Sequence, residues 1–480
     1  MQALFQPTST CQAGVCNKPA TVNCDDGLEC TVDACNATSG CSKSNKPWGT
    51  ACTNSALSYA FCAGSLCTGL EKVSAQVGGG SVSNGALFAI DRYGGTGGKV
   101  YSAGADTSSN PLNGIVANVV ESPQLGLQFN AAINSNSALL AQRNRLTVGG
   151  RSDDSQARAM VLNPVTGFWT TTGAPVLTGF ERSMRGMDMF LGANSAETYV
   201  MGGNQAGGGT PNQIGRTTWD GSAWSTIARM TVSSSKANCA QINVNVRGVY
   251  AASGTEVFLT GHYTASNANR TGVAFWDGNT TATCGNASGY NGVAYVDTTA
   301  YTQSFSAVVN TGAVPAMGQL TSVHGTGGKN VMAAGTHGTI VAYDGAKWSQ
   351  VTPAYTGMPL AWSNGFTVGS VYLTGSEAWL TGTVETGTGG STCRQLWLLH
   401  GTVDKGVWTW NKQIVSANND LAVCSNESSV RAWMQANAVW VDPATGSVYV
   451  VGSRGANGSN VATVNNPSRQ VELLVRVKMK

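Results

Sequence analysis

The side chains that could carry acid–base chemistry are few and scattered. The chain of 480 residues contains only four histidines, His262, His324, His337 and His400. His262 and His337 each follow a short apolar segment that ends in glycine, so we expect them in equivalent loops on one face of the fold. Asp153 and Asp154 are the only adjacent acidic pair in such loops, and a single pair without a second group is weak support for general acid–base catalysis.

The cysteines carry a stronger signal. Nine of the 13 fall in the first 67 residues: Cys11, Cys16, Cys24, Cys30, Cys35, Cys41, Cys52, Cys62 and Cys67. A zinc site would need paired C-x2-C knuckles, but no such pair occurs, and this segment has no histidine. A segment this short and this poor in large apolar residues needs covalent cross-links, so we expect disulfides and an oxidising compartment.

Four further cysteines lie later in the chain, and we predict the disulfides Cys239–Cys284 and Cys393–Cys424. The N-terminal segment then holds an odd number of cysteines. One cysteine would be left over, either as a buried thiol or as a bridge to a second chain.

Residues 24–41 read CDDGLECTVDACNATSGC. This stretch resembles the C-T-x-D-x-C repeat of slime-mould extracellular matrix proteins, which also occurs in secreted proteins of predatory and gliding bacteria. The resemblance implies an extracellular, matrix-like or adhesive setting and no catalysis. Asp25, Asp26 and Asp33 could be read as calcium ligands, but turn-forming aspartates are the default in such a loop, so we expect no cofactor.

The composition agrees with a secreted β protein. Only 11% of the residues are charged, against about 25% in typical domains, and there are 61 glycines. The net charge is +3 and the positive residues are scattered, which argues against nucleic-acid binding. No apolar run is long enough to predict a transmembrane helix.

From about residue 84 a short apolar strand ending in a small residue and glycine recurs seven times. The closing glycines are Gly104, Gly150, Gly203, Gly261, Gly335, Gly382 and Gly452. Repeats of this length with insertions are typical of propellers. Asp-Gly turns followed by tryptophan, as in Asp344-Gly-Ala-Lys-Trp348, add a hairpin signal.

The clearest unit spans residues 320–352 and predicts four antiparallel strands, which is one blade. It resembles Kelch-type blades and the blades of secreted bacterial propellers, although the full Kelch pattern is not kept. We therefore predict an all-β protein with a disulfide-rich module over 1–69 and a propeller of about seven blades over 70–480. Because the last repeat lacks an outer strand, we expect residues 70–77 to supply it.

The loops after the repeated glycines are long and polar, at 105–114, 151–156, 204–215, 262–271, 383–396 and 453–468. Insertions gathered on one face often form the binding face of a repeat protein. The predicted binding residues are Arg151, Asp153, Asp154, Asn204, Gln205, His262, Tyr263, Arg270, His337, Arg394 and Arg454.

These features predict a secreted or cell-surface structural protein that acts in adhesion, matrix or filament assembly. Its partners would be proteins or glycans, and the odd cysteine could link copies of the chain. We expect it not to be an enzyme, because neither a copper-oxidase set nor the boxes of a sialidase are found in the sequence. A glycan-binding lectin and a secreted polysaccharide hydrolase or lyase are the alternatives.

Overall fold

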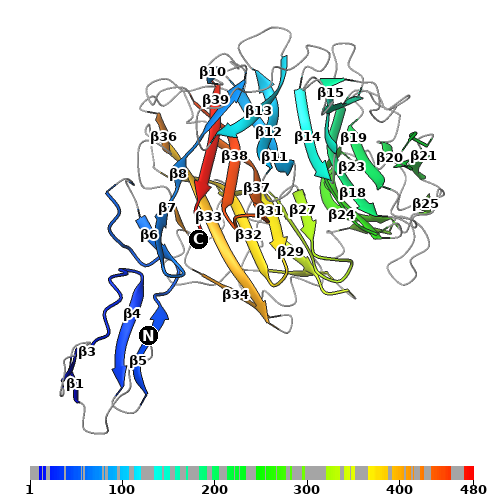
Figure 1. Cartoon of the computed structure of the whole chain (residues 1–480). Coiled ribbons are helices and arrows are strands. Elements are labelled where there is room, and N and C mark those ends of the chain that lie inside the picture. The colour runs from blue at the N-terminus through cyan, green and yellow to red at the C-terminus, as the bar shows by residue number, and fades with distance from the viewer. Residues whose placement is uncertain are drawn as a thin grey trace.

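The computed structural model shows an all-β protein (Figure 1). No helix in the described part of the chain is long and apolar enough to cross a membrane. The structure describes residues 10–12, 15–17, 22–36, 39–55, 57, 60–77, 80–81, 85–93, 98–106, 113–120, 135–142, 145–151, 157–162, 169–170, 183–191, 197–204, 213–220, 222–225, 228–233, 245–253, 256–265, 268–276, 282–283, 294–297, 320–335, 340–345, 348–351, 366–386, 392–404, 407–411, 414–415, 422–425, 434–455 and 470–479.

Seven sheets of four to six strands, here called blades 1 to 7, make up the described propeller. Blade 1 contains β11 (Gly85–Tyr93), β12 (Lys99–Asp106), β13 (Asn113–Val120), β9 (Ser74–Val77) and β10 (Gly80–Ser81). Blade 2 contains β14 (Ser135–Gln142), β15 (Arg145–Arg151), β16 (Ala157–Leu162) and β17 (Trp169–Thr170). Blade 3 contains β18 (Ser183–Leu191), β19 (Glu197–Asn204), β20 (Gln213–Trp219), β21 (Ala228–Ser233) and β25 (Ala282–Thr283).

Blade 4 contains β22 (Asn245–Ser253), β23 (Glu256–Ala265), β24 (Ala268–Trp276) and β26 (Ala294–Asp297). Blade 5 contains β27 (Leu320–Gly325), β28 (Val331–Gly335), β29 (Ile340–Tyr343) and β30 (Trp348–Gln350), close to the four strands predicted there. Blade 6 contains β31 (Phe366–Thr374), β32 (Glu377–Thr386), β33 (Thr392–Asp404), β34 (Val407–Trp410), β35 (Ile414–Val415) and β36 (Ala422–Ser425). Blade 7 contains β37 (Met434–Val441), β38 (Val448–Gly455), β39 (Gln470–Val477) and β8 (Glu71–Lys72).

The strands β11, β14, β18, β22, β27, β31 and β37, one from each blade, contact one another in a closed ring. We call them the inner strands, and they enclose the central channel of the propeller. Each inner strand carries a β-bulge close to the closing glycine of the next strand. At Gly104 and Gly452 the absence of a side chain is a steric requirement. A Cβ on Gly104 would lie 2.0 Å from the carbonyl oxygen of Ala86 on the inner strand, and a Cβ on Gly452 would lie 1.9 Å from the carbonyl oxygen of Gln435.

The N-terminal segment closes the ring, but only part of it does so in the predicted way. Glu71 and Lys72 form the outer strand of blade 7 by pairing with β39, as expected. Residues Ser74–Val77 pair instead with β13 of blade 1, so the prediction for them is wrong. The buried Val73 lies between the two pairings, and its N–H donates to Leu474. One extended segment therefore joins the two blades, because each had an open edge to cover.

Two ion pairs stabilise the closure of the ring, one between β39 and β8 within blade 7 and one between blades 1 and 7; we call this region the seam. Arg476 Nη2 lies 2.9 Å from Glu71 Oε2. Arg92 of blade 1 binds Asp442, whose side chain is fully buried at the end of β37, and Arg92 Nε donates to Asp442 Oδ1 at 2.7 Å. Burial alone would raise the pKa of Asp442, but hydrogen bonds from Arg92, Thr445 and the Ala444 N–H hold it below its usual value.

The N-terminal module consists of hairpins. Its strands are β1 (Thr10–Gln12), β2 (Val15–Asn17), β3 (Val22–Asn23), β4 (Thr31–Asn36), β5 (Gly40–Asn45), β6 (Ala60–Ala63) and β7 (Leu66–Gly69). Disulfides Cys24–Cys41, Cys30–Cys62 and Cys52–Cys67 staple these hairpins together. The predicted disulfide chemistry of the module is thus confirmed for these six cysteines.

The Cys30–Cys62 bridge ties the β4–β5 hairpin to the β6–β7 hairpin, and the two cysteines are 32 residues apart. Replacing both cysteines by serine is expected to lower the stability of the module by roughly 3–4 kcal/mol, because the unfolded chain regains the freedom of that loop. Denaturation followed by hydrogen exchange in β4–β7 would measure this. Removing Cys52–Cys67, which spans 15 residues, is the control and should have a slightly smaller effect; a larger one would contradict the loop argument.

The module is packed on the propeller by its β6–β7 hairpin, while β1–β5 extend away from it (Figure 1). Phe61 and Ala63 belong to the same buried cluster as Trp379 of β32. Trp48 completes the contact, with its ring centroid 5.5 Å from that of Trp379 and 5.4 Å from that of His400 on β33. The near half of the module is therefore part of the core of blades 6 and 7.

Candidate functional site

The residues predicted to form a binding face map to strand ends. Four of them lie on the second strand of a blade, each paired with the first residue of the inner strand: Arg151 with Ser135, Asn204 with Ser183, His262 with Asn245 and Arg454 with Met434. These four blades therefore present the predicted positions at the same end of the propeller. Asp153, Asp154, Gln205 and His337 lie outside the described residues.

Several of the predicted loops are shorter than expected. Residues 262–271 were predicted as one long loop, but β23 and β24 form a hairpin that pairs up to Ala265 and Ala268, so Tyr263 and Arg270 face each other in the ladder. Arg394 likewise lies inside the strand β33 and pairs with Glu385. The sequence predicts loops here because threonine, asparagine and glycine are common in loops as well as in long polar strands.

A second set of residues was missed by the sequence reasoning because it lies on the inner strands. Each of these residues lies three positions after the unpaired residue of the β-bulge in its own inner strand. They are Asp91, Asp188, Tyr250, His324 and Tyr372. In the ladder, each of them pairs with the residue three positions before the closing glycine of its blade. Along the sequence the spacing varies, because the turn between the two strands differs in length, so no fixed distance marks these residues. Each looks like one polar residue in an otherwise apolar strand.

Three of these side chains satisfy backbone groups of the neighbouring blade. The Ala251 N–H of blade 4 donates to Asp188 Oδ2 at 2.7 Å, and the Leu373 N–H of blade 6 donates to His324 Nδ1 at 3.0 Å. The Gly327 N–H of blade 5 donates to Tyr250 Oη at 2.6 Å. Inner strands have no further strand on the channel side, and buried N–H groups need partners. Side chains at this position of the inner strand thus link successive blades.

Burial moves the pKa values of two of these groups in opposite directions. It raises the pKa of Asp188 to about 6, against the hydrogen bonds from Ala251 and Met189, and lowers the pKa of His324 to about 4. Since Nδ1 of His324 accepts a hydrogen bond, the neutral ring carries its proton on Nε2.

The two shifts predict opposite pH dependences of stability. Between about pH 4 and 6.5 the unfolded chain protonates His324 but the folded chain does not, so the contribution of His324 to stability falls as the pH falls. Asp188 binds its proton more tightly in the folded chain, so its contribution rises over about pH 6 to 4. Urea denaturation at several pH values should show the stability deficit of His324→Asn shrinking on acidification and that of Asp188→Asn growing. Equal slopes for both variants would contradict the assignment.

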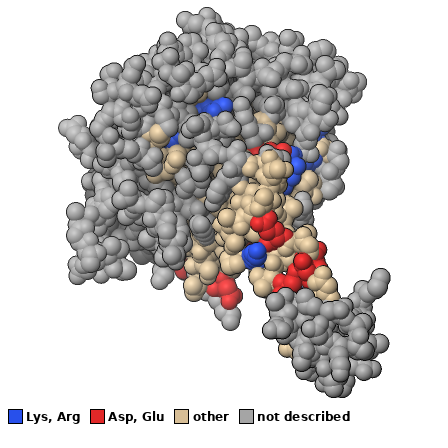
Figure 2. Space-filling model, turned by 90° about the vertical axis from the view of Figure 1, so that its left-hand side faces the viewer, with Lys and Arg blue, Asp and Glu red and all other residues tan. Residues whose placement is uncertain are grey.

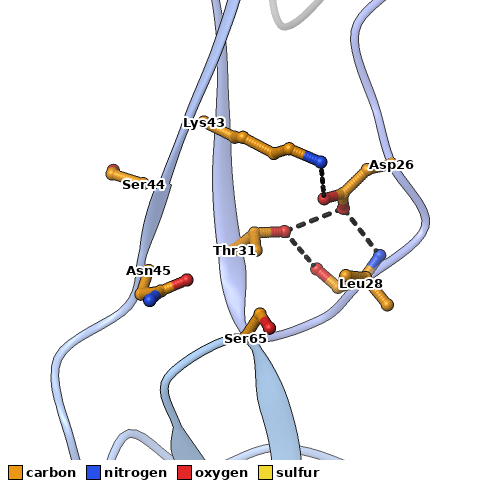
Figure 3. Close-up of a pocket in the computed structure, with 7 residues that line it drawn as sticks. All are labelled: Asp26, Leu28, Thr31, Lys43, Ser44, Asn45 and Ser65. Carbon is orange, nitrogen blue, oxygen red and sulfur yellow. Dashed lines mark hydrogen bonds and ion pairs between the residues drawn. The ribbon is translucent and has the colours of Figure 1, made fainter.

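The module carries the cavity shown in Figure 3, of about 380 Å³. Asp26 lies on one side of it, where Oδ1 accepts the Leu28 N–H at 2.9 Å and the Thr31 hydroxyl at 2.8 Å, while Lys43 Nζ lies 3.4 Å from Oδ2. These contacts hold the pKa of Asp26 below its ordinary value, and the hydrogen bond from the Leu28 N–H has the largest effect. The remaining lining residues are polar, and their side chains make no hydrogen bond to any residue that the structure describes. They are Ser44, Asn45 and Ser65.

Acidic side chains gather on the described part of the module, where Asp25, Asp26, Glu29 and Asp33 lie (Figure 2). Carboxylate oxygens of Asp25, Asp26 and Asp33 all lie within 4.8 Å of one another. Asp33 Oδ2 accepts the Asp26 N–H at 3.1 Å, and Oδ1 is buried with no partner among the described residues. Lys43 and the turn N–H groups already balance much of this charge.

We therefore expect the module to need no calcium. Adding calcium chloride or a chelator should change the melting temperature by less than about 1 °C, since only a ligand that binds the folded state stabilises it. A calcium-dependent rise that Asp33→Asn removes, and that Glu29→Gln leaves in place, would contradict this expectation.

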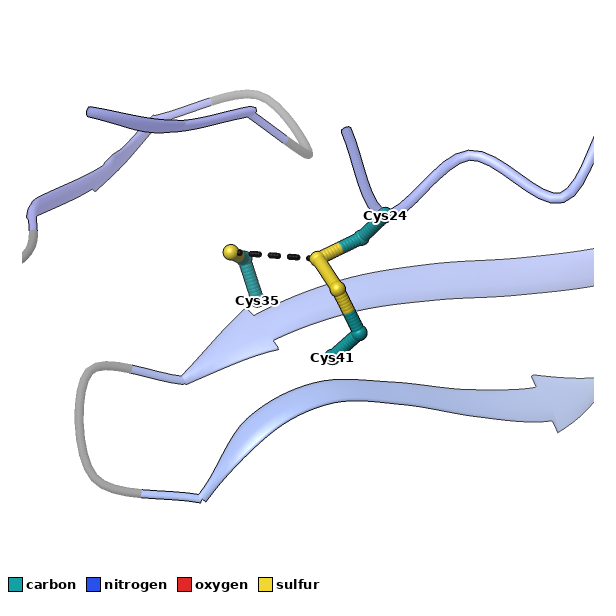
Figure 4. A group of neighbouring side chains, drawn as sticks. All are labelled: Cys24, Cys35 and Cys41. Atoms are coloured by element: carbon teal, nitrogen blue, oxygen red, sulfur yellow. Dashed lines mark hydrogen bonds between the residues drawn. A yellow bond between two sulfur atoms is a disulfide. The ribbon is translucent and has the colours of Figure 1, made fainter. Parts of the chain in front are cut away.

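Three cysteine sulfurs gather nearby (Figure 4). Cys24 is bonded to Cys41, and Cys35 Sγ lies 3.2 Å from Cys24 Sγ. Cys35 is itself disulfide-bonded, so neither sulfur carries a proton, and the contact is the packing of two disulfides. In the propeller, Cys393 is also disulfide-bonded and stands opposite Cys424 in the β33–β36 pair, as the predicted bridge requires. Cys239 and Cys284 lie outside the described residues, as do the side chains of Cys11 and Cys16.

No protein-family model and no curated protein matches the sequence. Solved structures of similar fold include the WD40 repeats of RRP9, at 8% identity and a TM-score of 0.47 over 86% of this chain and 100% of that one. YCF48 bound to D1 peptide has 10% identity and a TM-score of 0.43, over 83% and 93%. Phage phi92 endosialidase has 10% identity and a TM-score of 0.40, over 86% and 69%. Similarity at this level concerns the fold alone, and that fold is the β-propeller.

The prediction that the chain is not an enzyme is wrong. Structures of similar fold include the phage endosialidase, glycoside hydrolases and an oxidoreductase. The missing copper-oxidase set and sialidase boxes exclude two particular chemistries only, because a propeller can present reactive groups on any of its loops or inner strands.

Proposed function

We propose that this protein is a secreted or cell-surface binding protein that holds a glycan or protein partner in an adhesive or matrix-like setting. The propeller provides a rigid body over residues 70–480, and the disulfide-rich module over 1–69 is an arm fixed to it. The observation that carries the proposal is the construction of this arm, which is cross-linked by disulfides, packed on blades 6 and 7 through Trp48 and Phe61, and hollowed by a polar cavity.

The disulfides support the extracellular part of the proposal. Seven of the nine module cysteines are disulfide-bonded: Cys24, Cys30, Cys35, Cys41, Cys52, Cys62 and Cys67. Bonds of this kind persist in oxidising compartments and are rare in the reducing cytosol. The similarity of residues 24–41 to matrix-type repeats points to the same setting.

The cavity of the arm supports the binding part. Ser44, Asn45 and Ser65 offer hydroxyl and amide groups that are open to a ligand, and Lys43 and Asp26 add charged groups. Leu28, with 47% of its surface exposed, adds an apolar patch at the rim. Open polar groups beside a small apolar patch suit a sugar ring, which has hydroxyl edges and an apolar face.

A glycan array with the full-length protein tests the proposal. We expect retention on a subset of glycans, weakened at least severalfold by Asn45→Ala and Ser65→Ala together and unchanged by Ser42→Ala on the exposed part of β5. Retention that is unchanged by the double substitution would indicate that the glycan binds the predicted loop face and not the arm. Turnover of the retained glycan, followed as release of reducing ends, would replace the binding role with an enzymatic one.

Intact mass of the secreted protein with and without reductant tests the assembly part. A covalent dimer or polymer that collapses to monomer on reduction would support assembly through the odd cysteine. A monomer under both conditions would leave binding without covalent assembly.

A further inference from the structure

The inner strands build a site of their own, separate from the arm and from the predicted loop face. Four aromatic rings come from consecutive blades 4 to 7: Tyr250, His324, Tyr372 and Trp440. The centroids of Tyr250 and His324 are 5.4 Å apart, and His324 stacks on Tyr372 at 4.0 Å. Tyr372 packs in turn against the cluster that holds the buried Trp440. The rings of Tyr250, His324 and Tyr372 are therefore in continuous contact across blades 4 to 6, next to the cluster of Trp440, and these four residues are here called the aromatic arc.

Carboxylates come from the other side of the ring. Asp91 of blade 1 and Asp188 of blade 3 occupy the same strand position as the aromatic residues, and both are only half-buried. Burial first, and then the negative charges of Asp91, Asp188 and Asp442, raise the pKa of Tyr372. Asp188 lies beside the aromatic arc, because its Oδ2 accepts the N–H of Ala251, the residue after Tyr250.

The negative charge of Asp188 has no counter-charge among the described side chains. Asp442 is paired with Arg92, but Asp188 has only two backbone N–H donors, from Ala251 and Met189, and no cationic partner among the described side chains. A carboxylate removed from water without a counter-charge is unfavourable, and a cation beside it relieves that penalty.

One polar atom on the arc can still accept a hydrogen bond. The hydroxyl of Tyr372 has no hydrogen-bond partner among the residues that the structure describes, and Tyr372 keeps part of its surface accessible. His324 contributes its ring face, because its Nδ1 already accepts a hydrogen bond and its Nε2 carries the proton. The site thus combines aromatic faces, one open acceptor and a carboxylate.

We propose that the central channel binds a small organic cation, a protonated amine or a quaternary ammonium group, between Asp188 and the aromatic arc. Aromatic faces attract such cations through their quadrupoles, and the effect grows when the cation is desolvated. A calcium ion would instead need six to eight oxygen ligands, whereas the carboxylate oxygens of Asp188 already accept backbone hydrogen bonds. The site goes beyond the proposed glycan or protein binding by the arm and does not depend on it.

Calorimetric titration of the full-length protein with tetramethylammonium chloride, against sodium chloride at the same ionic strength, tests the proposal. We expect saturable binding of tetramethylammonium alone. Asp188→Asn should weaken it at least about tenfold, which is the loss of one charge partner worth about 1.4 kcal/mol, while Glu29→Gln on the module should leave it unchanged.

Tyr372→Leu provides a second, independent variant, because its hydroxyl makes no hydrogen bond that folding could lose. It should weaken binding by about 2- to 30-fold, the range of a cation–aromatic contact. Three results would each overturn the proposal. The first is absence of tetramethylammonium binding up to about 0.1 M. The second is binding by Asp188→Asn and Tyr372→Leu that is as strong as in the unmodified protein, and the third is equal binding of sodium or calcium ions. If Asp188→Asn does not fold, the Tyr372→Leu result decides.

Discussion

Replacing Arg92 by methionine is expected to lower the free energy of unfolding by about 3–5 kcal/mol, the usual loss when a buried ion pair is broken from one side. The partner Asp442 has a fully buried side chain, and the Arg92 side chain is only 10% exposed. The substitution therefore leaves a carboxylate with no counter-charge at the seam between blades 1 and 7. Denaturant unfolding at neutral pH measures the loss.

Two further variants separate this effect from a general weakening of the seam. The double variant Arg92→Met, Asp442→Asn removes the stranded charge as well, so it should be more stable than Arg92→Met alone. Lys478→Met is the matched surface control, because Lys478 is 51% exposed and lies 3.7 Å from Glu71; its loss should stay below about 1 kcal/mol. Equal losses for Arg92→Met and Lys478→Met would show that burial does not matter here.

Trp48→Ala is expected to detach the arm from the propeller, with a loss on the order of 3 kcal/mol in the contact between module and blade 6. Trp48 touches Phe61 of the module, at 5.1 Å between ring centroids, and both Trp379 and His400 of the propeller. Hydrogen exchange in β6–β7 and β32–β33 should rise, while exchange in β4–β5, held by Cys24–Cys41, should change little.

Trp48→Phe keeps an aromatic ring and should give only a fraction of that loss. Val32→Ala is the control on the far hairpin, where Val32 is 48% exposed, and it should leave the exchange of β32–β33 unchanged. Unchanged exchange in β32–β33 after Trp48→Ala would mean that the arm is held by other contacts.

The blades were predictable because their signals are local. A closing glycine recurs in each repeat, and at Gly104 and Gly452 the carbonyl of the inner strand comes too close for a side chain. An Asp-Gly pair marks a turn, as at Gly345 with its positive φ of 93°. The spacing of the cysteines likewise predicted disulfides. Residues 74–77 were assigned to the wrong blade because the alternation of apolar residues says that a strand forms but not which of two open edges it covers.

The inner-strand site could not be read in the same way. Asp188, His324 and Tyr372 are far apart in the chain, and each contacts its partner only because neighbouring blades pack through their inner strands. Whether a polar residue in an apolar strand points into the core or toward the channel depends on the bulge of that strand, and the bulge shifts every later side chain to the other face. The contact of Trp48 with Trp379 and His400 has the same origin, since it joins segments more than 300 residues apart.

The seam also sets the order in which the protein can be completed. Synthesis proceeds from the N-terminus, and domains generally fold as they emerge. The module can form its disulfides early, but the surface of β32–β33 on which Trp48 and Phe61 rest is made much later, and Arg476, the partner of Glu71, is 405 residues away. Until β39 has been synthesised, the arm, the open blade edges and their apolar side chains are exposed together, so the chain needs protection from aggregation during the whole interval between the synthesis of β8 and that of β39.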